Sequence, residues 1–205
     1  MRLALLTVCL LTVAAPSARA FPTAAQIKQA FTAMDTTRNN AINAAEWDAA
    51  SFSLFRAADK NNNNFIDGSE LQSSSLAQDT FLRADTDRDG RLSVGEFMEL
   101  RRTLFRIADI DRNDSLSLLE FELMILMEQV GWVDRNTNGR IELSELADSL
   151  RKAFEQLDVN QDGLLTSAEA SFLQPEFFKL FDTDQNGKLS SAEFVAGYRS
   201  ALLSL

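Results

Sequence analysis

The chain has 205 residues, of which 45% are hydrophobic, and it carries a formal net charge of −10. It contains no histidine, and its one cysteine is Cys9. Beyond residue 20 the composition therefore excludes zinc, copper and haem sites of the usual histidine and cysteine type, as well as catalysis by a histidine base or a cysteine nucleophile.

The first 20 residues have the pattern of a cleaved signal peptide. Arg2 precedes an apolar run from Leu3 to Ala15, and the segment ends in Ala-Arg-Ala at residue 20. The apolar run is too short to span a bilayer comfortably, although an uncleaved anchor is the alternative. We expect a mature chain that starts at Phe21, has no transmembrane segment and is exported, either to a periplasm or to the outside of the cell.

The rest of the chain, residues 21–205, is an internal repeat. Seven segments of twelve residues begin with Asp, end with Glu and carry oxygen-bearing residues at the third and fifth positions. Their starts are 24, 26, 24, 25, 24 and 24 residues apart, and the eighth residue is always Ile or Leu. We number them loops 1 to 7, at residues 35–46, 59–70, 85–96, 109–120, 134–145, 158–169 and 182–193.

This pattern predicts oxygen-only calcium sites. In such a loop the side chains at positions one, three, five and twelve and the backbone carbonyl at position seven coordinate the ion. The predicted side-chain ligands of loops 2 to 7 are Asp59, Asn61, Asn63, Glu70, Asp85, Asp87, Asp89, Glu96, Asp109, Asp111, Asn113, Glu120, Asp134, Asn136, Asn138, Glu145, Asp158, Asn160, Asp162, Glu169, Asp182, Asp184, Asn186 and Glu193. The predicted carbonyl ligands belong to Phe65, Arg91, Ser115, Arg140, Leu164 and Lys188.

The loops differ in how well they fit. The sixth position, where the chain turns with positive φ, is Gly in loops 3, 5, 6 and 7, Asn64 in loop 2 and Asp114 in loop 4. Loop 1 is the weakest, because Asp35 and Glu46 are its only anionic ligands and it contains Arg38. We therefore expect about six calcium ions, with loop 1 binding weakly or standing empty.

The acidity of the chain belongs to these loops, which hold 22 of the 30 Asp and Glu residues. With no basic face evident, nucleic-acid binding is disfavoured. Two apolar positions flank the loops and are expected to form the core. The fourth residue before the loop is Phe in six copies and Val130 in the fifth, and the residue after the last Glu is apolar in every copy.

The spacing predicts an all-α array with shared helices and short β contacts between loops. The segments after loops 1, 3 and 5 lack Pro and Gly, so each exit helix should continue as the next entry helix, for example from Val94 to Ala108, about 22 Å long. Ser73–Ser75, Gly131 and Pro175 should interrupt the other three connections. We predict that loops 2 and 3, 4 and 5, and 6 and 7 pair, leaving loop 1 unpaired. The alternative is that non-adjacent loops pair.

Over about residues 25–200 the repeats resemble the EF-hand superfamily. The close spacing is distantly similar in layout to lanmodulin and to calmodulin-like proteins, and the exported location is typical of bacterial periplasmic EF-hand proteins. Lanmodulin loops have Pro at the second position, and none of these loops does. The resemblance implies a calcium-binding protein, acting as a buffer or as a module that calcium stabilises.

Three other functions are alternatives to this one. A calcium-dependent adaptor would bind a protein partner through the apolar segment 121–133, although burial of that segment between hands is favoured. A lanthanide-binding role is a minor alternative. An enzyme is disfavoured, because the sequence has no nucleophile–base pair and no Gly-rich phosphate loop, and a saturated EF-hand site has no open coordination position. The identity of a partner and the oligomeric state do not follow from the sequence.

Overall fold

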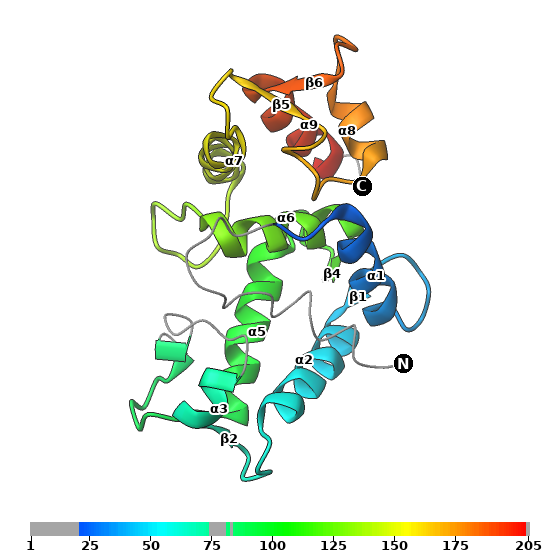
Figure 1. The fold of residues 1–205 in the computed structure, drawn as a ribbon. Coiled ribbons are helices and arrows are strands. Elements are labelled where there is room, and N and C mark those ends of the chain that lie inside the picture. Colours follow the sequence, from blue (N-terminus) through cyan, green and yellow to red (C-terminus); the bar gives the residue numbers. More distant parts are fainter. Residues whose placement is uncertain (1–20, 74–80, 83, 204–205) are drawn as a thin grey trace.

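The computed structural model describes residues 21–73, 81–82 and 84–203, so the predicted signal peptide, Ser74 and Ser75 lie outside the described residues (Figure 1). The described fold is all-α with short two-stranded ladders, as predicted. Its elements are α1 (Ala24–Met34), β1 (Ile42–Asn43), α2 (Ala44–Ala58), β2 (Phe65–Ile66), α3 (Gly68–Ser73), β3 (Leu92–Ser93), α5 (Val94–Ala108), β4 (Ser115–Leu116), α6 (Leu118–Val130), α7 (Leu143–Leu157), β5 (Leu164–Thr166), α8 (Pro175–Phe181), β6 (Lys188–Ser190) and α9 (Ser191–Leu203).

The predicted shared helices are present. Helices α2, α5 and α7 follow loops 1, 3 and 5, and each runs for 15 residues without interruption into the next loop. At the C-terminus of each, the first Asp of the following loop donates its backbone N–H to the carbonyl of the Phe four residues earlier, at 2.9 Å. A single helix therefore holds one loop at its start and the next loop at its end.

The predicted breaks also occur where Gly131 and Pro175 stand. Helix α6 ends at Val130, and Gly131 caps it with φ of 81°, a conformation that favours glycine. Pro175 is the first residue of α8, where its missing N–H costs no helical hydrogen bond. Gly131 therefore ends a helix and Pro175 begins one, so neither lies inside a helix. The helix expected after loop 6 is absent, because residues 167–172, between β5 and α8, form turns.

The loop pairing is only partly as predicted. Loops 2 and 3 pair through β2 and β3, and loops 6 and 7 pair through β5 and β6. The predicted pairing of loops 4 and 5 is wrong, and so is the prediction that loop 1 is unpaired. Loop 1 pairs with loop 4, with Ile42 opposite Leu116 in an antiparallel ladder of β1 and β4. Within the described residues, loop 5 forms no strand.

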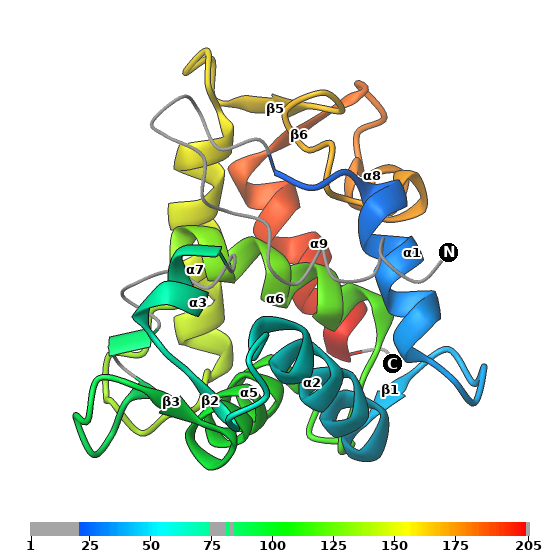
Figure 2. The ribbon, with the colours of Figure 1, turned by 60° about the horizontal axis from the view of Figure 1, so that its bottom comes forward.

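The shared helices explain this nested pairing. Helices α2 and α5 lie side by side and run in opposite directions (Figures 1 and 2). The pairing of loops 2 and 3 joins the end of α2 to the start of α5. Because both helices are unbroken and equally long, their other ends also meet, and these ends carry loop 1 and loop 4. The choice of partner for loop 1 is thus a consequence of helix continuity.

Two groups of buried side chains form the core. The smaller one lies under loops 2 and 3 and consists of Leu54, Phe55, Ile66, Phe81, Ala84, Leu92 and Phe97. The larger one contains the buried residues of α1, α6, α7 and α9 and the far ends of α2 and α5. Helices α2 and α5 therefore contribute to both groups, and they connect the hand pair of loops 2 and 3 to the rest of the molecule.

The flanking apolar positions pack in the core, as expected. Aromatic contacts join the Phe before one loop to the aromatic residue after its partner loop, with ring centroids 5.6–6.1 Å apart. These contacts are Phe31–Phe121, Trp47–Phe105, Phe55–Phe97 and Phe154–Phe194. Phe178 is half-buried, and the side chain of Leu71 is outside the described set.

Helix α6 is the central element in both views (Figures 1 and 2). Seven consecutive side chains, residues 121–127, are buried, which accords with the apolar character of this helix all round its circumference. The favoured prediction for segment 121–133, burial between hands, is therefore confirmed for residues 121–127, whereas Glu128 is exposed. No helix in the described ranges is both long enough and apolar enough to cross a membrane.

Candidate metal centres

All seven loops have the same backbone conformation. Both the fourth and the sixth residue have positive φ in each of them, between 54° and 79°. The sixth position was predicted to do so, and Asn64 and Asp114 adopt it at 66° and 61°. The fourth position was not predicted, because the residues there include Arg38, Thr137 and Gln161, which carry no glycine-like signal.

The first Asp of each loop organises this turn. In loop 3, one carboxylate oxygen of Asp85 accepts the N–H of Asp89 at 3.2 Å, and the other accepts the N–H of Gly90 at 3.0 Å. The first Asp makes the same two bonds in each of the other loops. The oxygens at the third and fifth positions are held in addition by backbone N–H groups two residues further on. These bonds hold the acidic side chains against the backbone of the turn.

The last Glu is held by a helix cap. In loop 3, Glu96 is the third residue of α5 and forms a capping box with Ser93, the ninth loop residue. Its other oxygen accepts the backbone N–H of Thr86 at 2.8 Å and the hydroxyl of Thr86 at 3.0 Å. The Thr36 and Thr183 hydroxyls make the same contact in loops 1 and 7. The Ser-x-x-Glu spacing in the sequence indicates the caps. No sequence pattern predicted that these threonine hydroxyls donate to the last Glu.

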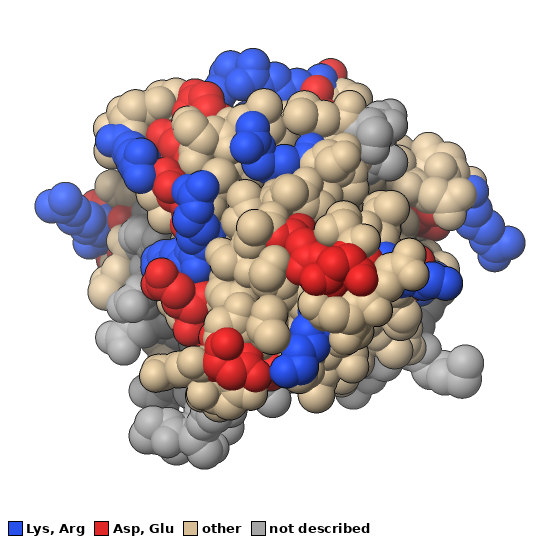
Figure 3. All heavy atoms as spheres, turned by 90° about the horizontal axis from the view of Figure 1, so that it is seen from above, with Lys and Arg blue, Asp and Glu red and all other residues tan. Residues whose placement is uncertain are grey.

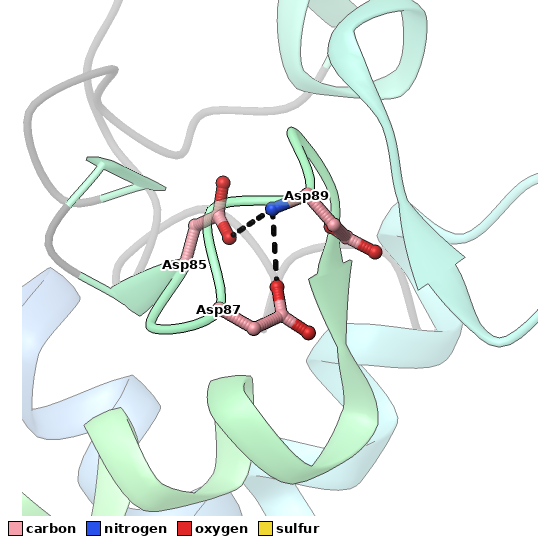
Figure 4. A group of neighbouring side chains, drawn as sticks. All are labelled: Asp85, Asp87 and Asp89. Atoms are coloured by element: carbon pink, nitrogen blue, oxygen red, sulfur yellow. Dashed lines mark hydrogen bonds between the residues drawn. The ribbon is translucent and has the colours of Figure 1, made fainter.

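Three loops bring carboxylates together closely enough to share one ion. One ligand oxygen from each member lies within 4.8 Å of the others in the groups Asp85, Asp87 and Asp89; Asp109, Asp111 and Glu120; and Asp182, Asp184 and Glu193. Figure 4 shows that one oxygen of Asp85 and one of Asp87 point to the backbone N–H of Asp89 and accept it. Oxygens that each lie 2.3–2.6 Å from a central calcium ion are at most about 5 Å apart, so these groups fit calcium.

The remaining predicted sites use amides in place of some carboxylates. Loops 2 and 5 have Asn at both the third and the fifth positions, and loop 6 has Asn160 at the third. Their first Asp and last Glu residues occupy the same places in the turn as in loop 3. The donor set is made of oxygen throughout, which suits a hard cation such as calcium.

The electrostatics of the loops differ between positions. The N–H of Asp89 favours the charged form of Asp87, but burial and the neighbouring carboxylates of Asp89, Glu96 and Asp85 outweigh it and raise the pKa of Asp87. Burial raises the pKa of Glu120 and acts in the same direction on Glu96. At Glu96, however, hydrogen bonds from Ser93 and Thr86 prevail and lower the pKa to about 2. Similar bonds, first from Ser190, lower the pKa of Glu193 to about 2. A cation between these groups would relieve the repulsion at the third position.

Loop 1 has the closed conformation of the other loops despite its poor ligand set. Asp35 accepts the N–H groups of Asn39 and Asn40 at 3.0 and 2.9 Å, and Glu46 accepts that of Thr37 at 2.9 Å. Its ladder with β4 places it beside loop 4. Loop 1 is therefore formed as a partner for loop 4 by hydrogen bonds within the chain.

The comparison with known families agrees with this geometry. A model described as "EF hand" matches the chain at residues 53–73, 77–100, 150–169 and 173–197, which contain loops 2, 3, 6 and 7. No curated protein matches the chain. EF hands are calcium-binding repeats. The repeat period and the loop conformation extend from the four matched loops to loops 1, 4 and 5. The chain is therefore a multi-repeat protein of the EF-hand superfamily.

Proposed function

We propose that this protein is an exported calcium-binding protein that holds about six ions, with loop 1 weak or empty, and whose folding is coupled to calcium binding. The observation that carries the proposal is the turn that all seven loops share, together with the three groups of carboxylates, in loops 3, 4 and 7, whose oxygens lie close enough together to share one ion. Export is supported by the pattern of residues 1–20.

Coupling to folding follows from the charge in the loops. Each loop places two to four carboxylates in a small volume, and the raised pKa of Asp87 is a sign of the repulsion between them. A bound divalent ion replaces this repulsion by coordination and stabilises the state in which the ligands are assembled. The protein would then act as a calcium buffer or as a module that is compact where calcium is abundant.

The adaptor function receives less support. Its candidate surface was the apolar segment 121–133, and residues 121–127 are buried in α6. Exposing them would require the surrounding helices α1, α5 and α7 to move away. Binding of a nucleic acid is not supported either, because on the face shown in Figure 3 the Lys and Arg side chains are interspersed with Asp and Glu.

We also propose that the protein is not an enzyme, because the loop carboxylates are engaged as ligands and as acceptors of backbone N–H groups. Lanthanide binding stays the minor alternative: trivalent ions suit the same oxygens, but loops 1 to 7 lack the Pro at the second position that marks lanmodulin.

Calorimetric titration of calcium into the chain from Phe21, with far-ultraviolet circular dichroism recorded alongside, tests the proposal. We expect five to seven ions, given seven loops of which one is weak, and a large gain in helix. Absence of calcium uptake at millimolar concentrations would overturn it, and lanthanide ions would then be the next titrant.

A further inference from the structure

Loop 5 is the one loop without a partner among the described residues. It projects from the side of the molecule between α6 and α7, at the left in Figure 1. Its eighth residue, Ile141, is 7% exposed, whereas the eighth residues of the six paired loops are 0–1% exposed. Ile141 is thus nearly buried within its own copy, and what loop 5 lacks among the described residues is the backbone pairing that the other loops have.

Loop 5 occupies a place comparable to that of loop 1. Helix α7 runs from loop 5 to loop 6 and packs beside α9, just as α2 runs from loop 1 to loop 2 and packs beside α5. Loop 1 has loop 4 next to it at the far end of this helix pair. No described loop stands in the corresponding position next to loop 5.

The three ladders in this chain define how one loop covers another. In each, position eight lies opposite position eight, and position seven of one loop lies opposite position nine of the other. Such a ladder has two-fold symmetry, so a loop can pair in the same register with a second copy of itself.

The charges of loop 5 fit that register. In the pair formed by loops 2 and 3, the register continued by one residue places Asp67 at position nine across from Arg91 at position seven, so opposite charges face each other there. Loop 5 carries both members of such a pair, with Arg140 at position seven and Glu142 at position nine. None of the other loops has opposite charges at these two positions.

We propose that loop 5 pairs with loop 5 of a second copy of this chain, forming a symmetric dimer. Ile141 lies opposite the Ile141 of the second copy, and Arg140 of each copy lies opposite Glu142 of the other. Arg140 is exposed and, among the described residues, has no ion-pair partner, whereas Arg135 in the same loop pairs with Asp148.

The dimer is expected to be weak and dependent on concentration. The edge is only a few residues long, so the surface area buried by the contact would be far smaller than the area that stable complexes bury. The residues that would flank it, Val130 and Leu146, are already buried within the same copy. Because Ile141 is nearly buried within its own copy as well, the contact depends mainly on backbone pairing and on the two cross-strand charge pairs.

Charge reversal tests the register. R140E places two acidic residues opposite each other, E142R places two basic ones, and each variant should dimerise at least about tenfold more weakly than the unchanged chain. An equimolar mixture of R140E and E142R restores both opposite-charge pairs and should dimerise again. R112E, a reversal at an exposed arginine of the already paired loop 4, is the matched control and should leave dimerisation unchanged.

The measurement is sedimentation velocity on the full chain over a series of concentrations in excess calcium, with circular dichroism to show that each variant is folded. A monomer at every concentration would overturn the proposal, as would a dimer that survives in R140E alone or a mixture that stays monomeric. Because calorimetry reports calcium uptake independently, failure of the dimer and failure of calcium binding are distinguishable.

Discussion

In the proposed calcium sites, one carboxylate at the twelfth loop position would both cap the following helix and bind the ion. In loop 3, Glu96 caps the first turn of α5 and presents an oxygen on the side of the loop where Asp85 and Asp87 lie. A bidentate ligand that is also the third residue of a helix ties the ion to the start of that helix. Loss of its charge should therefore affect binding more than folding of the other hands.

Replacement of Glu96 by Gln tests this role. The amide keeps the shape but loses the charge, so we expect one calcium ion fewer at moderate calcium, or that site weakened by roughly 10- to 100-fold. Calorimetric titration measures the number of ions. Glu99→Gln is the control, because Glu99 is exposed, lies outside the loops and pairs with Arg106 at 2.9 Å. An unchanged titration of Glu96→Gln would contradict the assignment.

Glu122 makes stability depend on pH. Burial raises its pKa to about 8 from 4.5, outweighing the opposite influence of Gln174. The folded chain thus binds this proton more tightly than the unfolded chain, so its contribution to stability is full below pH 4.5 and is lost as the pH rises towards 8. The slope is at most about 1.4 kcal/mol per pH unit.

Urea unfolding of Glu122→Gln in saturating calcium, between pH 5 and 8, should show a flatter dependence on pH than the unchanged chain. The variant should gain stability relative to the unchanged chain as the pH rises. The same slope in both proteins would show that Glu122 is ionised in the folded state or is solvated there.

The residue types predicted which loop positions carry ligands, but they predicted only one of the two positions with positive φ. Gly, Asn and Asp at the sixth position predicted positive φ because these residues tolerate it. The fourth position has the same conformation at Arg88 and Gln185, where the two hydrogen bonds to the first Asp and the ligand geometry impose it. Because the whole loop imposes the positive φ at the fourth position, the type of residue found there does not indicate it.

At the scale of elements, α8 and α9 pack more closely than any sequence pattern indicated. A Cβ placed on Gly197 of α9 would lie 2.2 Å from a ring carbon of Phe181 in α8. The absence of a side chain at residue 197 is therefore what lets Phe181 lie against α9, where it also contacts Tyr198 at 5.1 Å between ring centroids.

Gly197→Ala should destabilise the protein by about 1–3 kcal/mol, because the clash outweighs the better helix propensity of alanine. Gly95→Ala is the matched control in α5, where a Cβ would meet only the Ser93 hydroxyl oxygen, at 3.9 Å. That change should be neutral or stabilising by up to about 1 kcal/mol. Chemical denaturation in saturating calcium measures the change in unfolding free energy for each variant. Equal changes would contradict the close approach of Phe181 to residue 197.

At the scale of the whole molecule, the prediction failed at the choice of partners for loops 1, 4 and 5. The spacing and the breakers Gly131 and Pro175 indicated correctly which helices are continuous. The prediction then paired loop 4 with loop 5, its neighbour in the sequence. The partner of loop 4 is set instead by the antiparallel packing of α2 on α5, which involves residues more than 50 positions apart.

The two buried clusters predict two levels of stability. Among the described residues, the cluster under loops 2 and 3 is much the smaller, so this hand pair should open at a lower free energy than α6, which is surrounded by the larger cluster. Hydrogen exchange followed by mass spectrometry in saturating calcium should show faster exchange in β2 and β3 than in α6. Equal protection of the β2 and β3 ladder and of α6 would contradict the prediction of two levels of stability.

The unbroken helices also restrict how this chain can change in length. The three loop intervals that contain α2, α5 and α7 are all 24 residues, whereas the three interrupted intervals are 26, 25 and 24 residues. One extra residue in an unbroken helix would rotate the loop at its end by about 100° and shift it by about 1.5 Å, which would separate it from its partner loop. Insertions and deletions in related sequences should therefore fall in the interrupted intervals, and the unbroken helices should keep their length.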